Sequence, residues 1–204
     1  VPASTLTENY EDLVNESDIA GFSYVGGIIG ASCLKQENAA TPLSIINCKN
    51  KGKIEVSSTA NTKDICENLG GITGYLCDGN IENCNSTLGT VDFMDFTVSD
   101  DFFSTEDLLG NYMGGIAGRC TSNARITNCS SDGGVLKGRN YIGGIVGLWD
   151  SEPPLEGNGK SNTTAIIGYN YVGGIAGANT SVDKDGLPLL ESESTPVISN
   201  WSNK

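Results

Sequence analysis

Apolar residues along the chain come in short groups separated by glycine, asparagine, serine and acidic residues. Groups of this length and spacing are typical of short β-strands joined by tight turns. Long apolar runs are scarce, which excludes a transmembrane helix. One group recurs as apolar-Gly-Gly-Ile-x-Gly, and its five copies are residues 25–30, 69–74, 113–118, 142–147 and 172–177.

The spacing of these copies predicts the architecture. Their first glycines lie 44, 44, 29 and 30 residues apart, which is typical of stacked repeats. Strands that recur at such long intervals favour parallel stacking, because hairpins pair strands that are closer in sequence. We expect an all-β fold, a single parallel β-solenoid (β-helix) of about five coils with a short N-terminal cap. The isoleucines expected inside it are Ile28, Ile72, Ile116, Ile145 and Ile175.

A second phrase, Ile-x-Asn-Cys, follows the first three glycine phrases at 45–48, 81–84 and 126–129, and the last copy has Trp201 in place of cysteine. Each cysteine copy leads through a polar turn to a Gly-x-Val-like group. Three strands and three bends then fit a coil of about 29 residues, and the longer units carry extra segments. Adjacent glycines disfavour a regular strand, so we interpret the pair as a corner that turns Val25 and Ile28 inward together.

This pairing of phrases resembles the GLUG repeat, named for its Gly-Leu-any-Gly core, of bacterial surface and secreted proteins. Isoleucine takes the place of leucine, and the Asn-Cys and Gly-x-Val elements match in three copies. The resemblance spans roughly residues 19 to 201. It implies an extracellular repeat module, and the family has no catalytic residues to transfer to this chain.

The domain boundaries follow from where the repeats begin. Residues 1–18 lack both phrases, and the spacing of Leu6, Tyr10, Leu13 and Val14 indicates helical character. A solenoid must cover its first coil, so we interpret 1–18 as an N-terminal cap. Residues 19–204 form the GLUG-like β-solenoid repeat domain, giving one domain overall.

A tyrosine stands two residues before the first glycine in four of the five copies, and Asn68 takes this position in the second. Stacking in register predicts a tyrosine ladder with rings about 4.8 Å apart. Such ladders serve structure; stacking against a carbohydrate is the alternative function.

The net charge of −13, with only 12 basic residues, argues against nucleic acid and against anionic membranes as partners. Acidity of this degree keeps an exported protein soluble. The partners that remain are a host or matrix glycan or protein, and we expect no direct membrane insertion. The module is expected to belong to a larger multidomain chain, with any export or anchoring segment outside residues 1–204.

Seven cysteines leave two states open. Three candidate disulfides would each join two strands of one coil: Cys33 with Cys48, Cys77 with Cys84, and Cys120 with Cys129. Alternatively, the cysteines are reduced and stack as small apolar residues in ladders. Cys66 has no partner in either state. A zinc site is not expected, because the chain has neither histidine nor a CxxC motif.

Loops on a rigid scaffold usually carry binding specificity, so we place candidate ligand binding in two unrepeated inserts. The insert at 91–109 offers Asp100, Asp101, Phe102 and Phe103, and the insert at 148–162 offers Trp149 beside Asp150. No cofactor is expected, although calcium at Asp100 and Asp101 is an alternative.

The expected function is a non-enzymatic module on the surface of a bacterium or secreted from it, in adhesion, ligand binding or as a stalk. The absence of histidine excludes Ser-His-Asp and Cys-His catalytic groups. One alternative is a glycan-active β-helix enzyme, which would use carboxylates of the 91–109 insert. Another is the accessory region of a secreted peptidase. The expected location is extracellular or at the cell surface.

Overall fold

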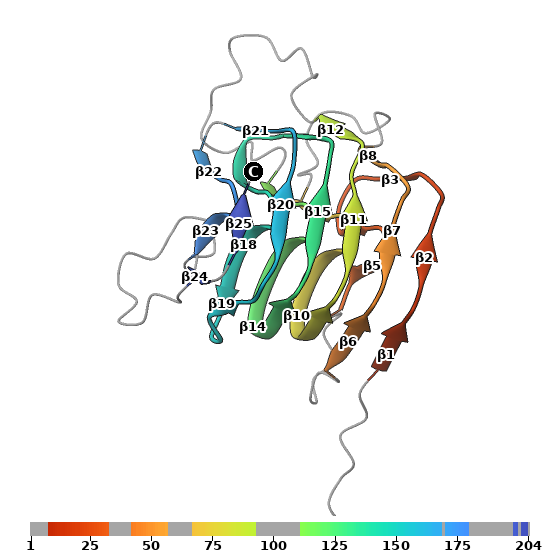
Figure 1. The fold of residues 1–204 in the computed structure, drawn as a ribbon. Coiled ribbons are helices and arrows are strands. Elements are labelled where there is room, and N and C mark those ends of the chain that lie inside the picture. Colours follow the sequence, from red (N-terminus) through yellow and green to blue (C-terminus); the bar gives the residue numbers. More distant parts are fainter. Residues whose placement is uncertain are drawn as a thin grey trace, which may run out of the picture.

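The computed structural model describes residues 8–32, 42–56, 67–92, 111–168, 170–179, 198–199 and 201–203. Within these ranges the secondary structure is all β, and neighbouring strands pair in parallel (Figure 1). The chain winds through five coils and begins a sixth, which confirms the predicted parallel β-solenoid. The described part of the chain contains no helix with the length and apolar character needed to cross a membrane.

Each coil contributes one strand to each of five columns, numbered here in the order in which the chain visits them. Column 1 contains β1 (Glu8–Glu11), β6 (Leu43–Ile46), the second half of β10 (Thr73–Glu82), the second half of β14 (Ala117–Thr127), β19 (Leu155–Glu156) and β24 (Ile198–Ser199). Column 2 contains β2 (Val14–Asn15), β7 (Lys49–Asn50), β11 (Asn85–Thr87), β15 (Ser130–Asp132), β20 (Lys160–Asn162) and β25 (Ser202–Asn203).

The remaining columns complete the coil. Column 3 contains β3 (Ile19–Gly21), β8 (Ile54–Val56), β12 (Thr90–Asp92), β16 (Val135–Lys137) and β21 (Ala165–Ile167). Column 4 contains β4 (Val25–Gly26), β9 (Glu67–Gly70), β13 (Asn111–Gly114), β17 (Asn140–Gly143) and β22 (Asn170–Gly173). Column 5 contains β5 (Ile29–Ala31), the first halves of β10 and β14, β18 (Val146–Ser151) and β23 (Ala176–Asn179).

Two long strands carry the chain from one coil into the next without a turn. Strands β10 and β14 begin in column 5 and end in column 1, and their pairing shifts register between Leu76 and Asp78. Near the shift, Gly79 has a φ of 113° and Ser122 a φ of 58°. These left-handed residues bend the strands where the wall of the coil changes direction.

The asparagine of the Ile-x-Asn-Cys phrase forms the bend between columns 1 and 2. Asn47, Asn83 and Asn128 have φ values of 55°, 54° and 52°. Asparagine tolerates this left-handed conformation better than most residues other than glycine. The recurrence of asparagine in the phrase is therefore explained by backbone geometry.

The glycine pair forms the corner between columns 4 and 5, as predicted, and it also reaches across the coil. A Cβ on the second glycine, Gly144, would overlap the side chain of Ser161 in column 2 and the backbone of Gly174. Gly71 and Gly115 meet Ser86 and Ser131 in the same way. The coil is thus pinched at this corner, and the pinch requires glycine on one side, opposite serine in these three coils and opposite Asn50 and Asn203 in the first and last.

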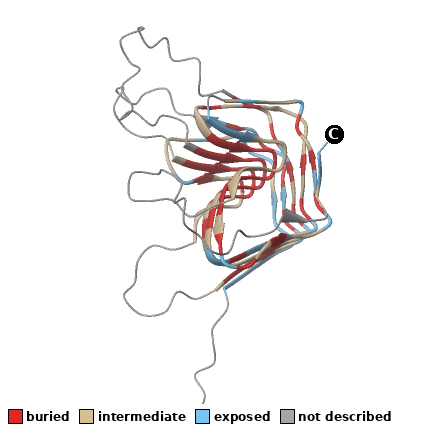
Figure 2. Ribbon diagram, turned by 90° about the vertical axis from the view of Figure 1, so that its left-hand side faces the viewer, coloured by how far each residue is buried: buried red, intermediate tan, exposed pale blue. Residues whose placement is uncertain are grey.

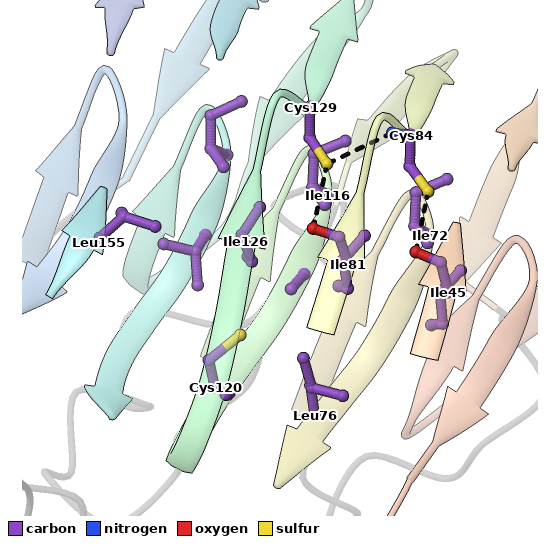
Figure 3. Close-up of a cluster of buried hydrophobic side chains, with 14 of the residues drawn as sticks. Ile45, Ile72, Leu76, Ile81, Cys84, Ile116, Cys120, Ile126, Cys129 and Leu155 are labelled. Atoms are coloured by element: carbon purple, nitrogen blue, oxygen red, sulfur yellow. Dashed lines mark hydrogen bonds between the residues drawn. The ribbon is translucent and has the colours of Figure 1, made fainter. Parts of the chain in front are cut away.

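The pinch divides the interior into two apolar cores, visible as buried segments on either side of it (Figure 2). The first core lies among columns 1, 2 and 5 and includes Ile72, Ile116 and Ile145, with Ile28 and Ile175 packed against it (Figure 3). The second lies between columns 3 and 4 and includes Val25, Leu69 and Ile142. The predicted inward turn of Val25 and Ile28 is confirmed, but the two side chains enter different cores.

Three expectations need correction. Residues 8–18 are not helical: β1 and β2 pair with β6 and β7 and form part of the first coil. Each coil has five strands instead of three, because the left-handed bends and the glycine corner add changes of direction. The segment 148–162 is not an inserted loop, since it contains β19 and β20 together with the end of β18.

Candidate functional site

Three of the four tyrosines that precede the glycine pairs, Tyr112, Tyr141 and Tyr171, stack along the solenoid as predicted, whereas Tyr24 does not join them. The ring centres of Tyr112 and Tyr141 are 5.1 Å apart, and those of Tyr141 and Tyr171 are 4.6 Å apart with the two ring planes nearly parallel. All three residues have φ between 55° and 59°. This left-handed bend places the ring of Tyr141 against Leu148 of column 5. Tyr112 and Tyr141 are consequently buried, and the last ring, Tyr171, is exposed.

Asn68 interrupts this stack, and a cation takes the place of the missing ring. The guanidinium of Arg119 lies 5.2 Å from the ring centre of Tyr112 and 6.0 Å from that of Tyr75. Tyr75 meets Tyr24 edge to face with ring centres 6.2 Å apart. We call Tyr24, Tyr75, Tyr112, Arg119 and Asp150 the arginine–tyrosine cluster. It continues the tyrosine stack through both cation–π and ring–ring contacts.

Asp150 holds Arg119 in this position. Its Oδ2 accepts a hydrogen bond from Nη2 of Arg119 at 3.3 Å, and both side chains are mostly covered. Glu67 lies in the same region, where burial raises the pKa of its carboxyl while the positive charge of Arg119 opposes the rise. The buried Nε of Arg119 and Oδ1 of Asn68 make no hydrogen bond to another described residue.

Trp149, predicted to display an aromatic ring for a ligand, is instead a core residue. It is fully buried in the first core, and its Nε1–H donates to the backbone oxygen of Pro153 at 3.0 Å. Because β18 extends to Ser151, strand alternation turns Trp149 inward and Asp150 outward. The two residues therefore do not act together at one surface, although Asp150 does reach the outside.

The other predicted ligand-binding residues, Asp100, Asp101, Phe102 and Phe103, lie outside the described residues. The same holds for the alternative calcium site at the two aspartates. Within the described ranges, no three His, Cys, Asp or Glu side chains are arranged to hold a metal ion.

The predicted disulfides are not formed among the described cysteines. Cys48, Cys77, Cys84, Cys120 and Cys129 are free thiols, whereas Cys33 and Cys66 lie outside the described ranges. Cys77 is only partly buried and follows the inward-pointing Leu76, so it does not face Cys84 in the core. Cys120 and Cys129 lie toward opposite ends of the stretch formed by β14 (Figure 3). The arrangement matches the alternative of reduced cysteines stacked in the core.

These buried thiols differ in acidity. Complete burial raises the pKa of Cys120 well above its ordinary range. Burial likewise raises the pKa of Cys48 and of Cys129. The pKa of Cys84 is lowered, mainly because the Cys129 thiol hydrogen-bonds to it. Cys84 is therefore the thiol of this group that ionises most readily.

Comparisons with protein-family models, with curated proteins and with solved structures found no match to this chain. Its candidate site is therefore defined by its own geometry. Sequence reasoning missed Arg119, and the signal that points to it is the single asparagine in a position otherwise held by tyrosine.

Proposed function

We propose that the chain is a non-enzymatic extracellular module of a bacterial cell-surface or secreted protein, and that it acts as a rigid stalk. The observation that carries this proposal is the direction in which the coils advance. The first described strands, β1 and β2, and the last, β24 and β25, stand at opposite ends of the stack (Figure 1). Whatever is joined to the two ends is held apart.

The length and stiffness of the stack suit this role. Column 2 has six strands in a continuous parallel ladder. At a spacing of about 4.8 Å, the ladder extends over about 24 Å. Contacts between coils involve backbone pairing, two apolar cores and the tyrosine stack, so bending would disrupt several of them at once.

Removing one coil tests whether the number of coils sets the distance between the two ends of the module. Deleting residues 144–173 joins Gly143 to Gly174 and preserves the glycine pair, because Gly143 and Gly173 occupy equivalent positions in neighbouring coils. Dyes attached through unnatural residues at positions 8 and 203 should then approach each other by about 5 Å, one strand spacing. Deleting residues 94–109, which lie between β12 and β13 within one coil, is the control and should leave this distance unchanged.

The biological role is tested by display. A reporter domain fused after residue 204 of a cell-anchored chain should become less accessible to a bulky ligand when the coil is removed. Equal accessibility in the native and shortened chains would reject the stalk. Assays for hydrolase, lyase and transferase activity on glycans and peptides are expected to be negative, and turnover by the purified chain would overturn the non-enzymatic proposal.

Adhesion is the second candidate function, favoured by the arginine–tyrosine cluster. Tyr24 is 47% exposed, and Arg119 and Asp150 reach the surface nearby. Aromatic rings beside a guanidinium often dominate binding interfaces. Tyr24→Ala should abolish attachment to a host glycan or matrix panel, and Tyr171→Ala, the same change at the other end of the stack, should not. If Tyr24→Ala attaches as well as Tyr171→Ala and the native chain do, the cluster is excluded as the binding site.

A further inference from the structure

Three cysteines form a column that runs along the first core. Cys48, Cys84 and Cys129 each follow a left-handed asparagine, and the residues after them pair in register from coil to coil. All three side chains are buried. Cys84 and Cys129 point the same way from neighbouring coils (Figure 3). We call these three residues the thiol column.

The sulfurs of Cys84 and Cys129 each lie against the backbone of the cysteine in the preceding coil. The backbone N–H of Cys48 donates to Sγ of Cys84 at 3.3 Å, and that of Cys84 donates to Sγ of Cys129 at 3.4 Å. The thiols in turn donate to backbone carbonyls, as Cys84 does to Glu82 at 3.3 Å. Neighbouring cysteines are thus held together without a covalent bond.

We propose that, when the chain folds under oxidising conditions, it forms one disulfide between neighbouring coils, and that Cys84 is always one of the two cysteines. Its partner is Cys48 or Cys129. This pairing is distinct from a bridge within a coil, and it does not depend on the function proposed above.

The spacing of the coils supports this pairing. Parallel strands lie about 4.8 Å apart, inside the range of about 4.4–6.8 Å that the Cα atoms of a disulfide require. Cys48 and Cys129 are two coils apart, about 9.6 Å, which is too far to bridge. A disulfide also requires the Cβ atoms of the two cysteines to lie about 4 Å apart. When it forms, the hydrogen bond from the backbone N–H of one cysteine to Sγ of the other is lost. Three thiols therefore yield one bridge and one free cysteine.

The chemistry balances with oxidised glutathione as the oxidant. The Cys84 thiolate attacks one sulfur of oxidised glutathione and expels one glutathione thiolate, which takes up the proton that Cys84 lost. The thiolate of Cys48 or Cys129 then attacks Sγ of Cys84 and expels the second glutathione thiolate, which is protonated in the same way. Two protein thiols are oxidised to a disulfide, and one oxidised glutathione becomes two reduced molecules. Because the folded column is buried, these steps precede the closing of the coils.

The test is to refold the full reduced chain in a buffer of oxidised and reduced glutathione, and to confirm the native fold by circular dichroism. The protein is then unfolded without reduction, its remaining thiols are alkylated, and disulfide-linked peptides are identified by mass spectrometry. The expected product links the peptide of Cys84 to that of Cys48 or Cys129. A link between Cys77 and Cys84, or between Cys120 and Cys129, would overturn the proposal, as would folded protein in which all three column thiols are alkylated.

Serine variants sharpen the test. Cys48→Ser should leave only the bridge between Cys84 and Cys129, and Cys129→Ser only that between Cys48 and Cys84. Cys84→Ser should abolish bridging within the column. A disulfide between Cys48 and Cys129 in folded Cys84→Ser protein would contradict the geometry. If Cys84→Ser does not fold, the two outer variants and the native chain still decide the result.

Discussion

Gly144 packs against the side chain of Ser161 on the opposite wall of the coil. This contact closes the coil at the glycine corner and separates the two apolar cores. The second glycine of the repeated phrase is thus required because there is no room for a side chain. A Cβ at this position would also overlap the backbone of Gly174 in the next coil.

Gly144→Ala should destabilise the fold. The added methyl must displace both Ser161 and a backbone carbonyl, and overpacking of this kind costs about 1–3 kcal/mol. Gly157→Ala is the matched control, since the nearest atoms to its added Cβ are 3.3 Å away. Urea unfolding followed by circular dichroism measures both variants. Equal stability of the two would show that the wall opposite Gly144 yields without cost.

The position of a tyrosine in the stack should determine its contribution to stability. Tyr141 is 3% exposed and contacts a ring on each side, whereas Tyr171 is 42% exposed with a ring on one side. Tyr141→Ala should lower the free energy of unfolding by about 3–4 kcal/mol, as large-to-small changes in a core do. Tyr171→Ala should cost less than half as much. Both residues have the same left-handed backbone, so the comparison isolates packing.

The described thiols should react with an alkylating reagent in the order of their exposure and acidity. Cys77 is partly exposed, and Cys120 is fully buried with a raised pKa. Native protein treated with iodoacetamide should therefore be modified at Cys77 first, and Cys120 should react only after unfolding. Peptide mass spectrometry over time gives the order. Faster labelling of Cys120 than of Cys77 would contradict the buried position of Cys120.

Glu67 should make the fold less stable as the pH rises. Burial raises its folded-state pKa above the ordinary value of 4.5, so the folded chain binds this proton more tightly than the unfolded chain does. The stabilisation is present at low pH and is lost as the pH rises through the raised pKa. Repulsion among the 25 acidic residues adds a similar trend, so the native chain must be compared with Glu67→Gln.

The stability difference between Glu67→Gln and the native chain should shift in favour of the variant as the pH rises from below 4.5 through the raised pKa of Glu67. Thermal unfolding at a series of pH values measures it. A difference that stays constant with pH would mean that Glu67 has the same pKa in both states.

Much of the architecture could be predicted because the repeats specify it locally. The stacked isoleucines and the glycine corner follow from one phrase that recurs in every coil. The first two strands of the first coil, β1 and β2, were not predicted, because Tyr10-Glu11-Asp12-Leu13 shares no residue with Ile45-Ile46-Asn47-Cys48. The two segments nevertheless occupy equivalent positions, and Asp12 adopts a φ of 56° in place of the asparagine. Aspartate and asparagine both tolerate the left-handed conformation, so the same bend forms although the residues of the two segments differ.

The candidate site could be predicted only in part, because it depends on how coils align. Arg119 reaches the gap left by Asn68 because column 5 pairs it with Tyr75. These residues lie in different repeats, and no local pattern links them. The position of Trp149 was predicted wrongly because its local sequence is misleading. Its neighbouring prolines and acidic residues indicated a loop, but the alternation of β18 directs the ring into the core.

The pinch at the glycine corner has a consequence for how substitutions combine. Ile145 and Ile142 are three residues apart, yet they enter cores on opposite sides of the corner. Substitutions at these two positions should have nearly additive effects on folding free energy, whereas Ile116 and Ile145, one coil apart in the same core, should show a coupling energy. Proximity in sequence is thus a poor guide to energetic dependence in this chain. The solenoid can accept changes in one core while the other keeps its packing.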